Sequence, residues 1–148
     1  MKRQIKHLNL LVYSIALSFT SLAQADESRP PDKSFADNLS SEYATCAAYY
    51  TVMVGALTHS GESELADQYS KNGSVAFDYA LEFAKDNRTE EMANSVTTSR
   101  FTLYAEGMMK EIGNDASNVS ILLNQYAYRC KEALEDPESF AKKILAEI

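Results

Sequence analysis

Residues 39–57 have the sequence LSSEYATCAAYYTVMVGAL, which we interpret as the middle of a long amphipathic helix. Its larger apolar side chains recur every three or four residues, the spacing that places them on one side of an α-helix. They are Leu39, Tyr43, Cys46, Tyr50, Met53 and Leu57. We expect this helix to span about 36–59, because Gly61 follows it in a position that favours a left-handed residue.

The same periodicity predicts three more long helices, at about 62–85, 90–112 and 116–134. Thr89 is the expected N-cap of the third, and Asn114 or Asp115 that of the fourth. A short fifth helix follows, because Asp136-Pro137-Glu138 provides an N-cap, a Pro at the first helical position and an early acid.

Two features of these helices leave alternatives open. Asn72-Gly73-Ser74 could end the second helix, but its apolar register continues through positions 69, 76 and 83, so we favour one helix. In the third, apolar side chains cover nearly half of the circumference, which predicts a helix contacted from two sides. They are Met92, Val96, Phe101, Leu103, Tyr104, Met108 and Ile112.

No segment shows the period-2 alternation of a strand, so the fold class is all-α. We predict an up-down four-helix bundle with a short fifth C-terminal helix, in which short loops make sequence neighbours antiparallel. Residues 36–148 form its single domain, and residues 26–35, which contain Arg29-Pro30-Pro31, form a flexible lead-in.

Residues 1–25 have the pattern of a signal peptide. Lys2, Arg3 and Lys6 precede an apolar stretch over 8–22, which ends at Ala23-Gln24-Ala25, an A-x-A cleavage site. A membrane anchor is the alternative, but the stretch is short and contains hydroxyl residues. We therefore expect a periplasmic or secreted protein that starts at Asp26 and is not embedded in a membrane.

The expected mature chain is strongly acidic. Cleavage removes three of the 14 basic residues and none of the 21 acidic ones, which leaves 11 basic and 21 acidic residues and a net charge of −10. This charge argues against nucleic acid as a partner, because phosphate contacts need clustered Lys and Arg. It favours a basic protein partner through electrostatic steering.

Cys46 and Cys130 lie in the middle of apolar stripes on the first and fourth helices. Because disulfides persist in exported proteins, we predict a structural bridge between them. Two buried thiols or a redox pair are the alternatives, although the C-x-x-C spacing of a redox motif is absent.

The sequence predicts no catalytic residues, no metal site and no cofactor, and we expect no enzymatic function. It contains no nucleophile elbow, zinc-protease motif, phosphate loop or dinucleotide fingerprint. Loss of residues 1–25 leaves a single histidine, His59, at the predicted end of the first helix, where an imidazole commonly interacts with the last carbonyls.

Four residues are candidates for a partner surface, because they lie off the main apolar stripes. They are Tyr49, Val52, Ile121 and Tyr128. Tyrosine is enriched where proteins meet. Alternatively, the fifth helix covers Ile121 and Tyr128 through Phe140 and Ile144. The tyrosines on the stripes form either a core layer or a partly polar pocket; they are Tyr43, Tyr50, Tyr69 and Tyr126.

These features predict an exported helical module that binds another protein, with a homo-oligomer as a further possibility. In format only, a small exported helical protein with one disulfide resembles immunity proteins that protect bacteria against cell-wall-degrading toxins. The expected role is therefore that of an inhibitor or immunity protein acting on another exported protein. The alternative is a periplasmic carrier with a small-ligand pocket between its helices.

Overall fold

The computed structural model describes residues 33–148, and every regular element in that range is helical. The elements are α1 (Lys33–His59), α2 (Ser63–Lys85), α3 (Glu90–Glu111), the 3-10 helix η1 (Ala116–Asn118), α4 (Ser120–Glu135) and α5 (Pro137–Ala146). The predicted all-α class is confirmed for these residues. The predicted signal peptide and positions 26–32 of the lead-in lie outside them. α1 begins earlier than expected, so residues 33–35 of the lead-in are helical.

Side-chain caps begin two of the helices as predicted. Thr89 Oγ1 accepts a hydrogen bond from the backbone N–H of Met92 at 3.4 Å, at the start of α3. Asp136 Oδ1 accepts one from the N–H of Ser139 at 3.1 Å, and Pro137 occupies the first turn of α5. Each cap satisfies a donor that has no partner within its own helix.

The fourth helix starts later than predicted. Asp115 Oδ1 accepts from the N–H of Ser117, only two residues ahead, at 2.9 Å. This local turn leads into η1, and α4 begins at Ser120. The predicted start at residue 116 is therefore displaced, because Asp115 caps a separate 3-10 turn.

Gly73 does not interrupt the second helix, and α2 is continuous as predicted. Gly73 is buried against α1, where an added Cβ would lie 3.3 Å from the Cβ of Tyr50. The glycine therefore allows the backbones of α1 and α2 to approach closely.

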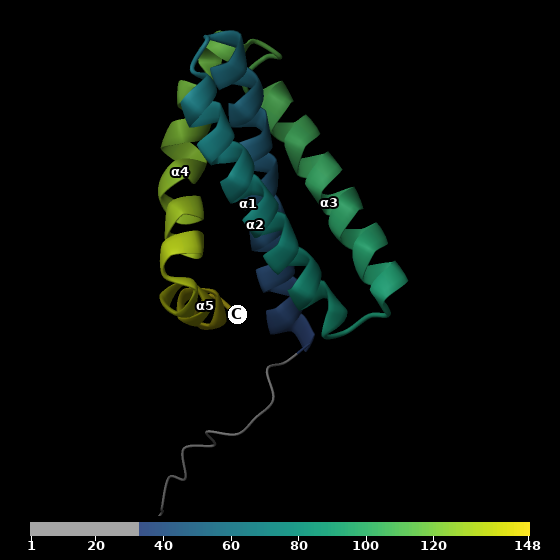
Figure 1. The fold of residues 1–148 in the computed structure, drawn as a ribbon. Helices are drawn as coiled ribbons and strands as arrows, with labels where there is room; N and C mark the ends of the chain where they lie inside the picture. Colours follow the sequence, from purple (N-terminus) through teal and green to yellow (C-terminus); the bar gives the residue numbers. More distant parts are fainter. Residues whose placement is uncertain (1–32) are drawn as a thin grey trace, which may run out of the picture.

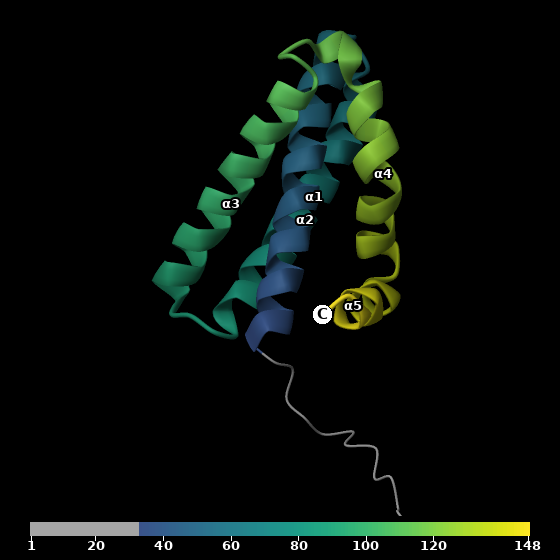
Figure 2. The ribbon, with the colours of Figure 1, turned by 180° about the vertical axis from the view of Figure 1, so that it is seen from behind.

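α1 and α2 form a central antiparallel pair, with α3 on one side and α4 on the other (Figures 1 and 2). α3 packs against both central helices, whereas α4 packs mainly against α1. α5 lies across the lower end in the view of Figure 1 and contacts α1 and α4. A helical bundle is thus confirmed, but the four-helix up-down arrangement is not, because α3 and α4 diverge on opposite sides of the central pair.

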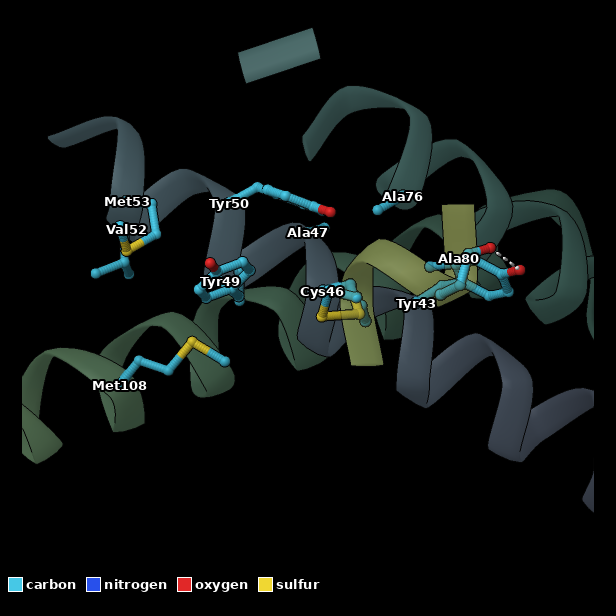
Figure 3. Packing of buried hydrophobic residues seen from close by; sticks show 14 of the residues in the cluster. Tyr43, Cys46, Ala47, Tyr49, Tyr50, Val52, Met53, Ala76, Ala80 and Met108 are labelled. Carbon is cyan, nitrogen blue, oxygen red and sulfur yellow. Dashed lines mark hydrogen bonds between the residues drawn. A yellow bond between two sulfur atoms is a disulfide. The ribbon is translucent and has the colours of Figure 1, made fainter. Parts of the chain in front are cut away.

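α1 is buried on almost every side, since it contacts α2, α3, α4 and α5. Ala44, Ala47 and Ala48 are each exposed by 1% or less, and their small side chains let the neighbouring helices come close. Larger side chains of α1 fill the space between the helices (Figure 3). Tyr43 is an example: its hydroxyl donates to the carbonyl oxygen of Ala133 at 3.0 Å, and burial raises its pKa to about 12.

Within residues 33–148, no helix has both the length and the apolar character needed to span a membrane.

Candidate functional site

The predicted disulfide between Cys46 and Cys130 is present and joins α4 to α1. Each cysteine is 1% exposed, and their Cα atoms are 5.2 Å apart. The bridge lies within the buried cluster around Tyr43 and Tyr49 (Figure 3). A covalent bond at this position holds the Cys130 side of α4 against the core. The opposite side of α4 therefore faces away from the core.

Ile121 and Tyr128 lie on the outer side of α4. They are two turns apart, with exposed fractions of 45% and 77%. The alternative that α5 covers them is wrong, because Phe140 and Ile144 are buried in the main core instead. The structure thus exposes a large aromatic and a branched aliphatic side chain on one side of a rigidly attached helix.

Tyr49 and Val52 do not lie on an exposed face of the molecule, and their prediction as partner contacts is wrong. They are only 1% and 9% exposed, because α1 is contacted on several sides rather than along one stripe. Val52 borders only a small cavity near the end of α1. The Tyr49 ring lies 5.1 Å from that of Tyr50 and 6.1 Å from that of Tyr126. Burial, together with the neighbouring Tyr69 hydroxyl, raises the pKa of Tyr49 well above its ordinary value.

The basic side chains near the outer side of α4 all have acidic partners. Arg129 donates from Nε to Glu42 Oε2 at 2.8 Å and from Nη2 to Glu147 Oε2 at 3.2 Å, and it lies over the Phe140 ring. The hydrogen bond with Glu42 is the main reason that its pKa is raised. Three lysines pair in the same region: Lys131 with Glu135, Lys142 with Glu138, and Lys143 with Glu132. All four basic residues of α4 and α5 are therefore paired with acidic ones.

An ion-pair cluster holds α3 against the start of α1. Asp37 Oδ1 lies 2.8 Å from Arg88 Nη1 and 3.1 Å from Arg100 Nη2. Arg100 Nη1 also lies 3.3 Å from Ser40 Oγ. Partial burial raises the pKa of Asp37, but the two guanidinium groups more than offset this effect and lower it below its ordinary value.

His59 lies at an open cavity of about 620 Å³ between the end of α1 and the α3–α4 connection. The walls combine apolar and polar side chains: Ala56, Leu57, His59, Ser60, Asn114, Asp115, Ala116, Ser117 and Val119. A smaller cavity of about 280 Å³ shares His59 with it. In the described part of the chain, no three His, Cys, Asp or Glu side chains are grouped so that they could hold a metal ion.

Comparison with known proteins identifies no relative: no family model, no curated protein and no solved structure matches this chain.

Two features of these surfaces were not expected from the sequence. One is the Asp37–Arg88–Arg100 cluster, whose members lie far apart in the sequence, so that no local pattern indicates their contact. The other is the exposure of Met92 and Leu103 on α3, which are 56% and 64% exposed although we predicted both for the apolar face.

Proposed function

We propose that the protein is an exported helical module that binds another protein through the outer side of α4. The observation that carries this proposal is the 77% exposure of Tyr128, on the same side as Ile121, on a helix that a disulfide attaches to the core. Tyrosine supplies a large contact area at a small entropic penalty, and rigid attachment reduces the cost of ordering the surface on binding.

In this proposal the protein acts in the periplasm or outside the cell, after cleavage of residues 1–25. Its role is that of an inhibitor or immunity protein for another exported, cell-wall-active protein, and it is not itself an enzyme. The mature charge of −10 would accelerate encounter with a basic partner, while Ile121 and Tyr128 would supply contact area. We also propose that the four long helices alternate in direction along the chain, as they do in an up-down bundle.

Two experiments test this proposal. Intact-mass measurement of the exported protein should give a chain that starts at Asp26. Affinity capture from the exported protein fraction should then identify a partner, whose purified form is titrated against Ile121→Ala and Tyr128→Ala variants. Val75→Ala is the matched control, because Val75 on α2 is 45% exposed, as is Ile121.

We expect both α4 variants to weaken binding by about 1–2 kcal/mol or more, and the Val75 variant to bind like the wild type. Equal binding by all three variants would remove α4 as the binding surface.

A small-ligand carrier is the second candidate, and the cavity beside His59 favours it. Its volume of about 620 Å³ lies within the usual range for ligand sites, and apolar and polar groups are mixed on its walls. Native mass spectrometry of protein purified from its own cells should detect a bound small molecule if this function is correct. An Ala56→Phe substitution should then displace that molecule, because Ala56 lines both cavities.

A further inference from the structure

The outward side of α3 exposes two large apolar side chains, Met92 and Leu103, that nothing within the described residues covers. Their exposed fractions are 56% and 64%. They are eleven positions apart in the helix, so they lie on the same side of it, about 16 Å apart along its axis. α3 packs against α1 and α2 on its other side, through Ala93, Thr97 and Met108.

This exposure accounts for the breadth of the apolar face of α3. The sequence predicts a helix contacted from two sides, but α1 and α2 occupy only one of them. Between the two apolar side chains lie Ser95 and Ser99, both exposed. Small side chains between two larger ones leave space for side chains of a second helix laid along the surface.

α3 itself is acidic. It contains four acidic residues and two basic ones, a net charge of −2, whereas α4 contains two of each and has no net charge. Of the two basic residues of α3, Arg100 is engaged by Asp37. Among the described residues, Glu91 and Glu106 form no ion pair, and both are exposed close to the apolar side chains. Lys110, one turn beyond Glu106, is the single basic residue on this side of α3.

We infer that the outward side of α3, from Glu91 to Glu106 with Met92 and Leu103 as apolar contacts, is a docking surface for a basic amphipathic helix of a partner protein. The apolar side of such a helix covers Met92 and Leu103, and its Lys and Arg side chains reach Glu91 and Glu106. This inference does not depend on the α4 surface, which lies on the opposite side of the central helix pair (Figure 2).

Charge also favours a basic helix of a partner protein over two other occupants of this surface, a second copy of the chain and residues 26–32 of the same chain. A second copy of the chain would bring two α3 helices of net charge −2 together, and like charges in contact oppose association. The segment that precedes the described residues in the expected mature chain, DESRPPD at 26–32, has three acids against one Arg and no large apolar side chain. It therefore has neither the charge nor the apolar surface that α3 requires.

The probe is a fluorescein-labelled synthetic helix with Leu on one face and Lys on the other, titrated with the purified protein by fluorescence anisotropy. We expect saturable binding that weakens as salt is raised. Met92→Ser combined with Leu103→Ser should weaken binding about tenfold or more. Glu91→Gln combined with Glu106→Gln should weaken binding about threefold or more, because both carboxylates attract the Lys side chains of the probe. The effect is smaller than that of the apolar variant, because water and salt screen charges at an exposed surface.

Three controls make the test decisive. The same peptide with Glu in place of Lys should not bind. Ile121→Ser and Tyr128→Ala should bind the probe like the wild type, and this separates the α3 surface from the α4 surface. Melting temperatures should match the wild type for all variants, since the substituted side chains are exposed.

Unchanged binding by the Met92→Ser, Leu103→Ser variant would overturn the inference, because attraction would then depend on charge alone. Loss of binding in the α4 variants would overturn it too. The third adverse result would be self-association of the wild type in analytical ultracentrifugation that the Met92→Ser, Leu103→Ser variant abolishes. A second copy of the chain would then bind to this side of α3.

Discussion

α3 and α4 flank the same central helix, but they are attached to it by different interactions. α4 is joined to α1 by the Cys46–Cys130 bridge, and both of its basic residues, Arg129 and Lys131, are paired with acidic ones. α3 has no covalent link within the described residues. It depends on small buried side chains, on the contact between Phe101 and Phe77, and on Asp37 with its two arginines. Both helices nevertheless expose apolar side chains on their outer sides. The way in which a helix is attached to α1 therefore does not determine whether its outer side is apolar.

Among changes to the attachment of α3 and α4, removal of the disulfide should have the largest effect, and it should act on the α4 side. Cys46→Ala with Cys130→Ala opens a loop of 84 residues, which should lower the free energy of unfolding by about 4 kcal/mol in the chain-entropy description. Urea denaturation of the oxidised wild type and of the double variant measures this difference. The far-ultraviolet circular dichroism should remain helical, because the apolar stripes are unchanged.

Hydrogen exchange in the reduced protein should rise first in α4 and α5, with α3 less affected. Dithiothreitol should lower the urea midpoint of the wild type and leave that of the double variant unchanged. A wild type with the same midpoint before and after reduction would mean that the bridge does not stabilise this side.

Asp37→Ala should have the next largest effect and should act on the α3 side. It leaves Arg88 and Arg100, whose side chains are 19% and 23% exposed, without their carboxylate. The expected loss is about 2 kcal/mol, since removal of one partner leaves partly buried charged donors unsatisfied. Asp78→Ala on α2 is the control, because Asp78 is exposed and forms no ion pair among the described residues. Exchange should rise in α3 rather than in α4.

The ion pairs of Asp37 with Arg88 and Arg100 predict that the stability of the protein depends on pH in the acid range. The pKa of Asp37 is lowered in the folded protein, so its contribution to stability is complete above the ordinary pKa of about 4 and is lost as the pH falls through the lowered value. The difference in stability between the wild type and Asp37→Ala should therefore shrink in acid. A difference that stays the same as the pH is lowered from neutral into acid would show that the carboxylate charge is not its source.

The helices and the bridge were predictable because they depend on local patterns. Thr89 and Asp136 are recognisable caps, and the positions of Cys46 and Cys130 in their apolar stripes, together with export, favour a disulfide. Local patterns do not show how many neighbours a helix has. Tyr49 and Val52 are off the stripe of α1 and yet buried, because α1 is contacted on several sides.

α3 shows the opposite error. We expected Met92 and Leu103 on an apolar face contacted from two sides, but α3 is contacted on one side only, and its buried residues are Ala93, Thr97 and Met108. Apolar periodicity predicts which side chains share a side of a helix, but not whether that side faces the interior. Only Ile121 and Tyr128, opposite a narrow core stripe, were assigned correctly to an exposed side of their helix.

Arg129→Ala should have a smaller effect than Asp37→Ala, and on the opposite side of the molecule. It removes the ion pairs with Glu42 and Glu147 and the contact with the Phe140 ring, which together connect α4, α1 and α5. Because the Arg129 side chain is 40% exposed, solvent screens these pairs and we expect a loss of about 1 kcal/mol. Arg129→Lys should recover only part of the loss, because an ammonium group cannot contact both carboxylates as a guanidinium does. A loss equal to that of Asp37→Ala would mean that the ion pairs on the two sides stabilise the fold equally.

Tyr128→Ala should have the smallest effect on stability, and it separates a binding surface from a structural one. At 77% exposure the ring contributes little buried area, so the free energy of unfolding should change by less than about 0.5 kcal/mol. Tyr43→Ala is the comparison, because Tyr43 is 1% exposed and packs against Phe83 and Phe140, and its loss should be about 3–5 kcal/mol. If Tyr128→Ala destabilised the protein as much as Tyr43→Ala, the ring would be part of the packed structure and the α4 binding proposal would fail. If stability were unchanged while partner binding weakened, the exposed ring would act only in recognition. The inner side of α4 would then hold the helix to the core, and its outer side would be available to bind a partner.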